Sequence, residues 1–221
     1  MQSLNQILTE LNKSGVKLVA VSKTKPISQI MEIYEQGQHI FGENRVPELV
    51  EKAQQMPKDI EWHMIGHLQR NKVKGLVSHV AMIHSIDRVK LIKEVNKQAA
   101  SINRTIPCLL QLKIAEEETK SGFELEPLRD WLATNEWKSL QHIQIAGMMG
   151  MASFVDDMSI VRREFKYLKS SFEQLKGDFF QDNDQFKEIS MGMSGDYQIA
   201  IEEGSTMVRI GSLIFGPRNY G

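Results

Sequence analysis

A lysine follows a short run of small apolar residues near the start of the chain. The run at 18–22 reads LVAVS, and strand alternation places Val19, Val21 and Lys23 on one face. A lysine that is partly withdrawn from water loses its preference for the ammonium form, and the neutral amine attacks an aldehyde to form an imine. Lys23 is therefore a candidate for Schiff-base chemistry. Spacing alone leaves the alternative open that Lys23 and Lys25 are solvated charges of a loop.

Two segments near the C-terminus have the composition of a phosphate-binding site. Residues 190–196 (SMGMSGD) lead from a predicted strand into a predicted helix, and residues 207–212 (MVRIGS) end the last predicted strand. Small residues let backbone amides approach an anion, and a helix start adds N–H donors. The alternative is that Ser194 or Asp196 is only a helix cap and Gly211 only a tight turn. A phosphate site is favoured, and Arg209 can then face a ring nitrogen or pair with a carboxylate.

Short apolar runs alternate with amphipathic stretches along the chain, which is typical of repeated βα units around a parallel sheet. Strands are predicted at 17–22, 39–42, 61–66, 81–86, 107–114, 143–148, 188–192 and 207–211, and helices at 1–11, 27–36, 46–55, 87–100 and 196–203. Eight units predict an α/β fold: one (β/α)₈ TIM barrel over residues 1–221, with an N-terminal helix. An open doubly wound sheet is the alternative. Asp87 is expected to cap the helix at 87–100.

The charge balance argues against polyanionic partners. Lys and Arg number 27 against 28 Asp and Glu, so the net charge of -1 offers no footprint for nucleic acid or an anionic membrane. The N-terminal helix lacks the features of a secretory signal, and no apolar run approaches the roughly 18 residues of a membrane span. We expect a cytoplasmic protein. The single cysteine, Cys108, lies in an apolar run and is expected to be a buried structural thiol.

Other polar residues give weaker signals. His63 and His67 have the spacing of metal ligands on a helix, but Gly66 and the strand pattern argue against that geometry, so no metal site is predicted. The loop at 116–122 follows the fifth predicted strand on the active face, and Lys120 is a candidate second amine there. A Ser/His/Asp triad or a Walker-type loop is not evident, so acyl transfer and nucleotide hydrolysis have little support.

Several blocks together resemble one known family. They are VAVSKTKP at 19–26, FGENR at 41–45, EWHMIGHLQRNK at 61–72, TKSG at 119–122, GMM at 147–149, SMGMS at 190–194 and GSTMVRIGSLIFG at 204–216. The chain resembles the pyridoxal phosphate homeostasis protein family, which is similar to the barrel domain of fold-type III enzymes such as alanine racemase. The resemblance spans nearly the whole chain and implies pyridoxal 5′-phosphate as cofactor. It also implies that Lys23, rather than Lys25, forms the Schiff base.

The resemblance assigns further residues by position. It implies that Ser190 or Ser194, with backbone amides around Gly211 and Ser212, holds the phosphate, that Arg209 faces the pyridine nitrogen, and that Asn44 lines the ring pocket. An arginine beside that nitrogen disfavours ring protonation and makes the cofactor a poorer electron sink. Fold-type III racemases, by resemblance, also use an acid/base tyrosine and a C-terminal β domain. Here only Tyr197 is a plausible neighbour of the barrel mouth.

These considerations favour a monomeric carrier or regulator that binds pyridoxal phosphate reversibly, serves vitamin B6 homeostasis and has no catalytic residues. Its expected recipients are apoenzymes that depend on the cofactor. The runner-up is a minimal fold-type III enzyme, such as a low-activity amino-acid racemase that uses Lys23 as base. A third hypothesis is a barrel that acts on a phosphorylated metabolite without pyridoxal phosphate and leaves Lys23 as an ordinary charge.

Overall fold

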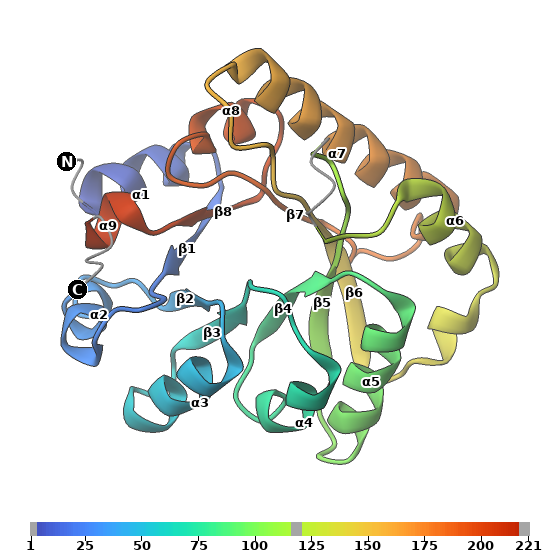
Figure 1. The fold of residues 1–221 in the computed structure, drawn as a ribbon, viewed down its shortest axis with the longest axis horizontal. Helices are drawn as coiled ribbons and strands as arrows, with labels where there is room; N and C mark the ends of the chain where they lie inside the picture. The colour runs from blue at the N-terminus through green and yellow to red at the C-terminus, as the bar shows by residue number, and fades with distance from the viewer. Residues whose placement is uncertain (1–3, 116–120, 217–221) are drawn as a thin grey trace.

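Eight parallel strands form a closed barrel in the computed structural model, which describes residues 4–115 and 121–216. Each strand pairs with the next along the chain, and the last pairs with the first (Figure 1). The strands are β1 (Lys17–Val21), β2 (Ile40–Glu43), β3 (Glu61–Met64), β4 (Met82–Ile86), β5 (Ile106–Gln111), β6 (Ile143–Met149), β7 (Glu188–Ser190) and β8 (Met207–Ile210). The predicted barrel is confirmed, and closure excludes the open sheet.

Helices cover the outside of the barrel. They are α1 (Leu4–Lys13), α2 (Ile27–Tyr34), α3 (Val46–Gln55), α4 (Val73–Leu76), α5 (Val89–Ala100), α6 (Leu125–Ala133), α7 (Met158–Phe179), α8 (Tyr197–Glu202) and α9 (Ser212–Phe215), with 3₁₀ turns at Arg70–Lys72 and Glu136–Ser139. All five predicted helices are present within a few residues. In the part of the chain that the structure describes, no helix combines the length and apolarity needed to cross a membrane.

Several predicted boundaries differ from the structure, and two strand ends and one helix cap do so for local reasons. The strand predicted to end at 192 stops at Ser190, because Gly192 adopts a left-handed φ of 93°. The strand predicted to reach 114 stops at Gln111, and Leu112 then forms an isolated bridge with Phe123. The prediction that Asp87 caps α5 is wrong: Arg88 occupies the cap position, and the Asp87 carboxylate pairs with Arg88 and His67 instead.

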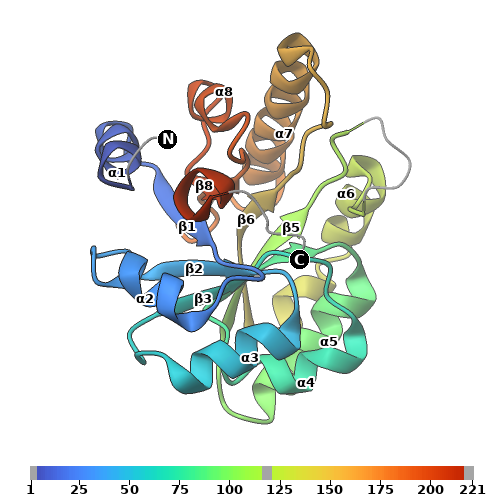
Figure 2. The same ribbon diagram turned by 60° about the vertical axis from the view of Figure 1, so that its left-hand side comes forward.

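The N-terminal helix closes the junction between the first and last strands. Leu4, Ile7 and Leu11 of α1 are buried in one cluster with Leu18 of β1 and Val208 of β8. Figure 2 shows α1 beside β1. This packing supports the strand pair that brings Val19 opposite Arg209.

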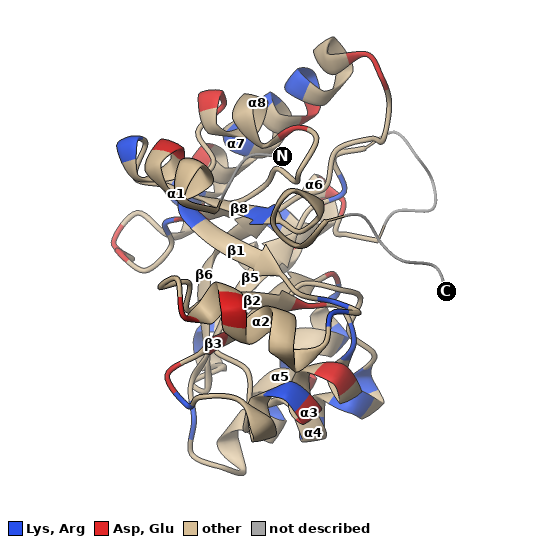
Figure 3. Cartoon of the chain, turned by 90° about the vertical axis from the view of Figure 1, so that its left-hand side faces the viewer, with Lys and Arg blue, Asp and Glu red and all other residues tan. Residues whose placement is uncertain are grey.

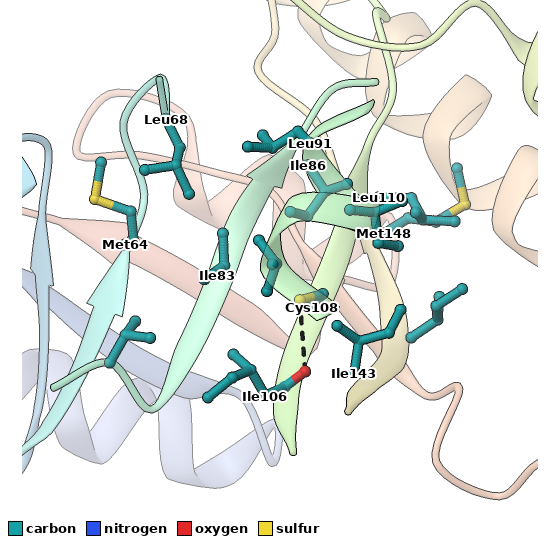
Figure 4. Packing of buried hydrophobic residues seen from close by; sticks show 14 of the residues in the cluster. Met64, Leu68, Ile83, Ile86, Leu91, Ile106, Cys108, Leu110, Ile143 and Met148 are labelled. Carbon is teal, nitrogen blue, oxygen red and sulfur yellow. Dashed lines mark hydrogen bonds between the residues drawn. The ribbon is translucent and has the colours of Figure 1, made fainter. Parts of the chain in front are cut away.

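The main apolar core lies between the barrel and its helices (Figure 4). Cys108 of β5 is fully buried in it, its thiol faces the carbonyl oxygen of Ile106 at 3.5 Å, and burial raises the pKa of the thiol. The expected structural role of Cys108 is confirmed. Acidic and basic residues are mixed along the chain, and α1 and α3 each carry both signs (Figure 3), although the basic residue of α3, Lys52, is buried.

Candidate cofactor site

A cavity of about 820 Å³ opens where the barrel strands have their carboxyl ends. Its size is within the range of cavities that hold small ligands. Of the seven site residues predicted from sequence, six line it: Lys23, Asn44, Ser194, Arg209, Gly211 and Ser212. The structure therefore brings together segments that follow β1, β2, β7 and β8.

Lys23 lies in a tight turn directly after β1. The N–H of Lys25 donates to the carbonyl oxygen of Ser22 at 3.1 Å, which closes the turn around Lys23 and Thr24. Thr24 has a φ of 63°, in the left-handed region that β-branched residues seldom adopt. Lys23 is partly buried and lines the cavity. These surroundings fit a Schiff-base lysine better than a solvated charge of a loop.

Asn44 directly follows β2 and reaches the cavity beside the end of β3. Gly66 makes this arrangement possible, because a Cβ atom there would lie 2.4 Å from the carbonyl oxygen of Asn44. A larger residue at position 66 would push the two loops apart and displace Asn44.

Arg209 of β8 is buried in the floor of the cavity. Its Nη1 donates to Oγ of Ser190 at 2.6 Å, and its Nη2 donates to the carbonyl oxygen of Gly150 at 3.0 Å. Burial lowers the pKa of Arg209 to about 10, partly opposed by the charge of Asp196, so the guanidinium stays positive at neutral pH. The two hydrogen bonds therefore fix the position of a positively charged donor that lines the cavity.

A chain of polar groups crosses the barrel interior beneath Arg209. Ser190 Oγ lies 3.0 Å from Nδ1 of His84, and Nε2 of His84 lies 2.9 Å from Nδ1 of His63. Burial lowers the pKa of His63 to about 3, with help from Lys17, and burial together with His63 and Arg209 lowers that of His84. Both imidazoles are thus neutral at pH 7. Each can accept a hydrogen bond at Nδ1, which lets the bonds run from Arg209 through Ser190 and His84 to His63.

Ser190 therefore differs from the other predicted residues. It is fully buried, it is not among the residues that line the cavity, and its hydroxyl is engaged by Arg209 and His84. Of the two serines offered for the phosphate, the geometry favours Ser194.

Ser194 and the segment after β8 meet at one side of the cavity. The N–H of Gly211 donates to Oγ of Ser194 at 3.3 Å, and α9 begins at Ser212. The first amides of a helix have no helical partner. Gly211 packs against β1, where a Cβ atom would lie 3.1 Å from the carbonyl oxygen of Val21. This side of the cavity offers hydroxyl and N–H groups to an anion.

Several groups outside the predicted set also shape the site. An apolar wall is formed by the segment between β6 and α7 and by the first residue of α7: Met151, Phe154, Val155 and Met158 line the cavity, joined by Met193. Ser153 anchors this segment, because its N–H and Oγ donate to the buried carboxylate of Glu164 at 2.7 and 2.6 Å. In sequence this wall resembles an ordinary loop, so only its position after a predicted strand could have indicated it.

The expectation that Tyr197 neighbours the barrel mouth is wrong. Its hydroxyl donates to Oε2 of Glu10 in α1 at 2.9 Å, and the side chain is buried in the α1 cluster. His67 does line the cavity, with its Nδ1 3.3 Å from Asp87. Lys120 lies outside the described residues. Among the described residues, no group of three or more His, Cys, Asp or Glu side chains is arranged to hold a metal ion.

Comparison with known proteins agrees with this fold. Residues 2–219 match the family model described as alanine racemase, N-terminal domain. In solved structures, the chain superposes on an alanine racemase of Clostridium difficile with a TM-score of 0.74, at 15% identity, over 98% of this chain and 61% of the racemase. That likeness concerns the barrel fold alone.

Closer relatives define a narrower group. The pyridoxal phosphate homeostasis protein of Haemophilus influenzae is 40% identical over 95% of this chain and 88% of its own length. The structure of PipY from Synechococcus elongatus with pyridoxal phosphate bound is 33% identical, with a TM-score of 0.84 over 95% of this chain and 98% of that one. The chain belongs to the pyridoxal phosphate homeostasis protein family.

Proposed function

We propose that this protein binds pyridoxal 5′-phosphate in the cavity as a Schiff base with Lys23 and holds it without catalytic turnover. The observation that carries the proposal is the convergence of Lys23, Asn44, Ser194, Arg209, Gly211 and Ser212 on one cavity. These residues supply an amine, a cationic donor and an anion-binding edge, which are the groups that an aldehyde, a ring nitrogen and a phosphate require. Bound pyridoxal phosphate in the related PipY supports the same ligand.

Each residue has a role in this proposal. Lys23 would hold the cofactor: its Nζ, in the neutral form, would add to the aldehyde carbon, and the aldehyde oxygen would leave as water. The hydroxyl of Ser194 and the amides around Gly211 and Ser212 bind the phosphate, while Asn44 lines the ring. Ser190 acts indirectly, since it holds Arg209 in place.

Arg209 argues for a carrier rather than an enzyme. Its charge persists at neutral pH, and its two hydrogen bonds go to neutral oxygens of Ser190 and Gly150. When bound, the cofactor supplies an aldehyde for amines and a ring that can accept electrons if its nitrogen is protonated. A fixed guanidinium beside that nitrogen disfavours the protonated form and weakens carbanion chemistry.

The first test is the absorbance spectrum of the protein with pyridoxal phosphate, before and after borohydride reduction. Wild type should show an imine band that reduction converts into a stable adduct on Lys23, and Lys23→Ala should lose both. Lys25→Ala is the matched control, because Lys25 lines the same cavity two residues away and should leave both signals intact. A band that survives in Lys23→Ala would show that the site is wrongly assigned and would favour the barrel for a phosphorylated metabolite.

A second measurement separates the carrier from the racemase alternative. In deuterated water with an amino acid, the loaded protein should exchange the Cα hydrogen no faster than free pyridoxal phosphate does. Exchange at an ordinary enzymatic rate, on the order of 1 per second, that requires Lys23 would establish an enzyme instead.

A further inference from the structure

The turn that carries Lys23 is held from beneath by charged side chains of β2 and α3. Oε1 of Glu43 accepts hydrogen bonds from Oγ of Ser22 at 2.6 Å and from Nζ of Lys52 at 2.7 Å. Lys52 also donates to the carbonyl oxygen of Ser22 at 2.9 Å. The residue before Lys23 is thus fixed through both its side chain and its backbone.

Thr24, the residue after Lys23, is held by the same cluster of charged side chains. The N–H of Thr24 donates to Oε1 of Glu48 at 2.6 Å, and Lys52 donates to that oxygen at 2.7 Å. Lys52 therefore links the two carboxylates that hold the turn on either side of Lys23. We refer to Glu43, Glu48 and Lys52 as the turn clamp.

The backbone of the turn shows that these contacts shape it. Thr24 has a left-handed φ of 63°, which is unfavourable for a β-branched residue and persists only where surrounding contacts enforce it. The Thr24 amide bond to Glu48 and the hydrogen bond from Lys25 to Ser22 are contacts of this kind. A strained turn with a cavity-lining lysine at its centre is typical of a functional element rather than a simple connection.

The electrostatics of the turn clamp also argue against a purely stabilising role. Glu43 is fully buried, Lys52 is nearly so, and Oε2 of Glu43 has no hydrogen-bond partner within the described ranges. Burial raises the pKa of Glu43 to about 7, against the lowering effect of Lys52. An ion pair buried in this way stabilises a fold less than apolar side chains of similar volume would. The buried ion pair is therefore better explained by the turn that it positions than by a contribution to stability.

We propose that Glu43, Glu48 and Lys52 are positioning residues that lock the turn at residues 22–25 so that the amine of Lys23 enters the cavity. The inference rests on the proposed function, because it assumes that Lys23 bonds the aldehyde. The hydrogen bonds of the turn clamp described above go to Ser22, to Thr24 and between its own members. Its loss should therefore affect the covalent bond and spare the noncovalent contacts.

Two ligands distinguish these effects. Pyridoxal 5′-phosphate can form the imine, whereas pyridoxine 5′-phosphate has an alcohol in place of the aldehyde and binds only noncovalently. Lys52→Met should weaken binding of pyridoxal phosphate by at least about tenfold and change that of pyridoxine phosphate by less than about twofold. Glu48→Ala, at a partly exposed site, should change binding in the same direction by a smaller factor and provides a variant that folds if Lys52→Met does not. Glu51→Ala is the control, because Glu51 is exposed on the same helix.

The outcomes separate the inference from the function beneath it. If the variants of the turn clamp bind pyridoxal phosphate like wild type while Lys23→Ala binds it weakly, the positioning role is wrong and the proposed function stands. Equal weakening for both ligands also overturns the positioning role, because the cluster then supports the whole pocket. If Lys23→Ala itself binds pyridoxal phosphate as tightly as wild type, both proposals fail.

Discussion

Ser190 and Ser194 lie four residues apart in one motif but have different surroundings. Ser190 is sealed beneath Arg209, whereas Ser194 lines the cavity beside Gly211. The sequence could not distinguish the two serines, because which of them faces the ligand depends on where the strand ends. The strand was predicted to end at 192, and it ends at Ser190. His84 could not be recognised either, since a single histidine in an apolar strand usually has only a packing role.

Replacement of the two serines should have different effects. Ser190→Ala leaves a buried donor of Arg209 without its partner, so we expect the free energy of unfolding to fall by about 1–3 kcal/mol in urea denaturation. Ser194→Ala should leave the unfolding free energy nearly unchanged but weaken pyridoxal phosphate about tenfold, with little effect on pyridoxal, which lacks the phosphate. Similar behaviour of the two variants in both assays would contradict the distinction.

The buried histidines predict a loss of stability in acid. In the folded state their pKa values lie below the usual 6.5, so below that pH the unfolded chain binds more protons and unfolding is favoured. Each histidine can remove up to about 1.4 kcal/mol per pH unit below pH 6.5, continuing toward about pH 3 for His63. Glu43, with its raised pKa, acts in the opposite direction between its usual 4.5 and about 7.

A variant isolates the histidine contribution from that of Glu43. Denaturation of wild type and His63→Gln at pH 7.5 and 5.5 should show a smaller loss for the variant. His79→Gln, at a partly exposed histidine outside the buried chain, should follow the wild-type profile. A variant with the full wild-type loss would show that His63 is not the group that takes up protons.

At the scale of elements, the apolar wall between β6 and α7 depends on one helix contact. Glu164 of α7 accepts two hydrogen bonds from Ser153, and this fixes the start of the segment that carries Phe154 and Val155. We expect Glu164→Ala to lower the free energy of unfolding by about 2 kcal/mol and to speed hydrogen exchange at the Ser153 amide. Glu173→Ala, which removes an exposed carboxylate from the same helix, should leave that amide protected.

The elements show where sequence patterns suffice and where they do not. The short apolar runs that alternate with amphipathic stretches predicted the strands, because parallel strands covered by helices are buried and must be apolar. Capping at Asp87 was wrong because the carboxylate has a stronger partner in Arg88, and Tyr197 turns to α1 because Glu10 offers its hydroxyl an acceptor. In both cases a polar side chain has a partner that the prediction did not consider: a neighbour in sequence for Asp87 and a distant residue for Tyr197. A local sequence pattern does not show which of several partners a side chain binds.

At the scale of the whole molecule, six predicted site residues reach one cavity because the barrel places all strand ends on one face. The order of strands alone was enough to predict this meeting. Its finer geometry depended on the turn clamp and on the chain from Arg209 to His63, which are long-range contacts.

The pairing of β1 with β8 has a consequence for biosynthesis. Val19 pairs with Arg209, so the segment that supplies the amine and the segment that supplies the guanidinium and the phosphate edge come from opposite ends of the chain. A ribosome releases Lys23 long before it has made residue 209. Until β1 pairs with β8, the lysine does not lie beside the guanidinium and the phosphate-binding edge of the site. Nascent chains that stop before residue 209 should therefore be unable to hold the cofactor in this site, and binding requires that β8 has been made and the barrel has closed.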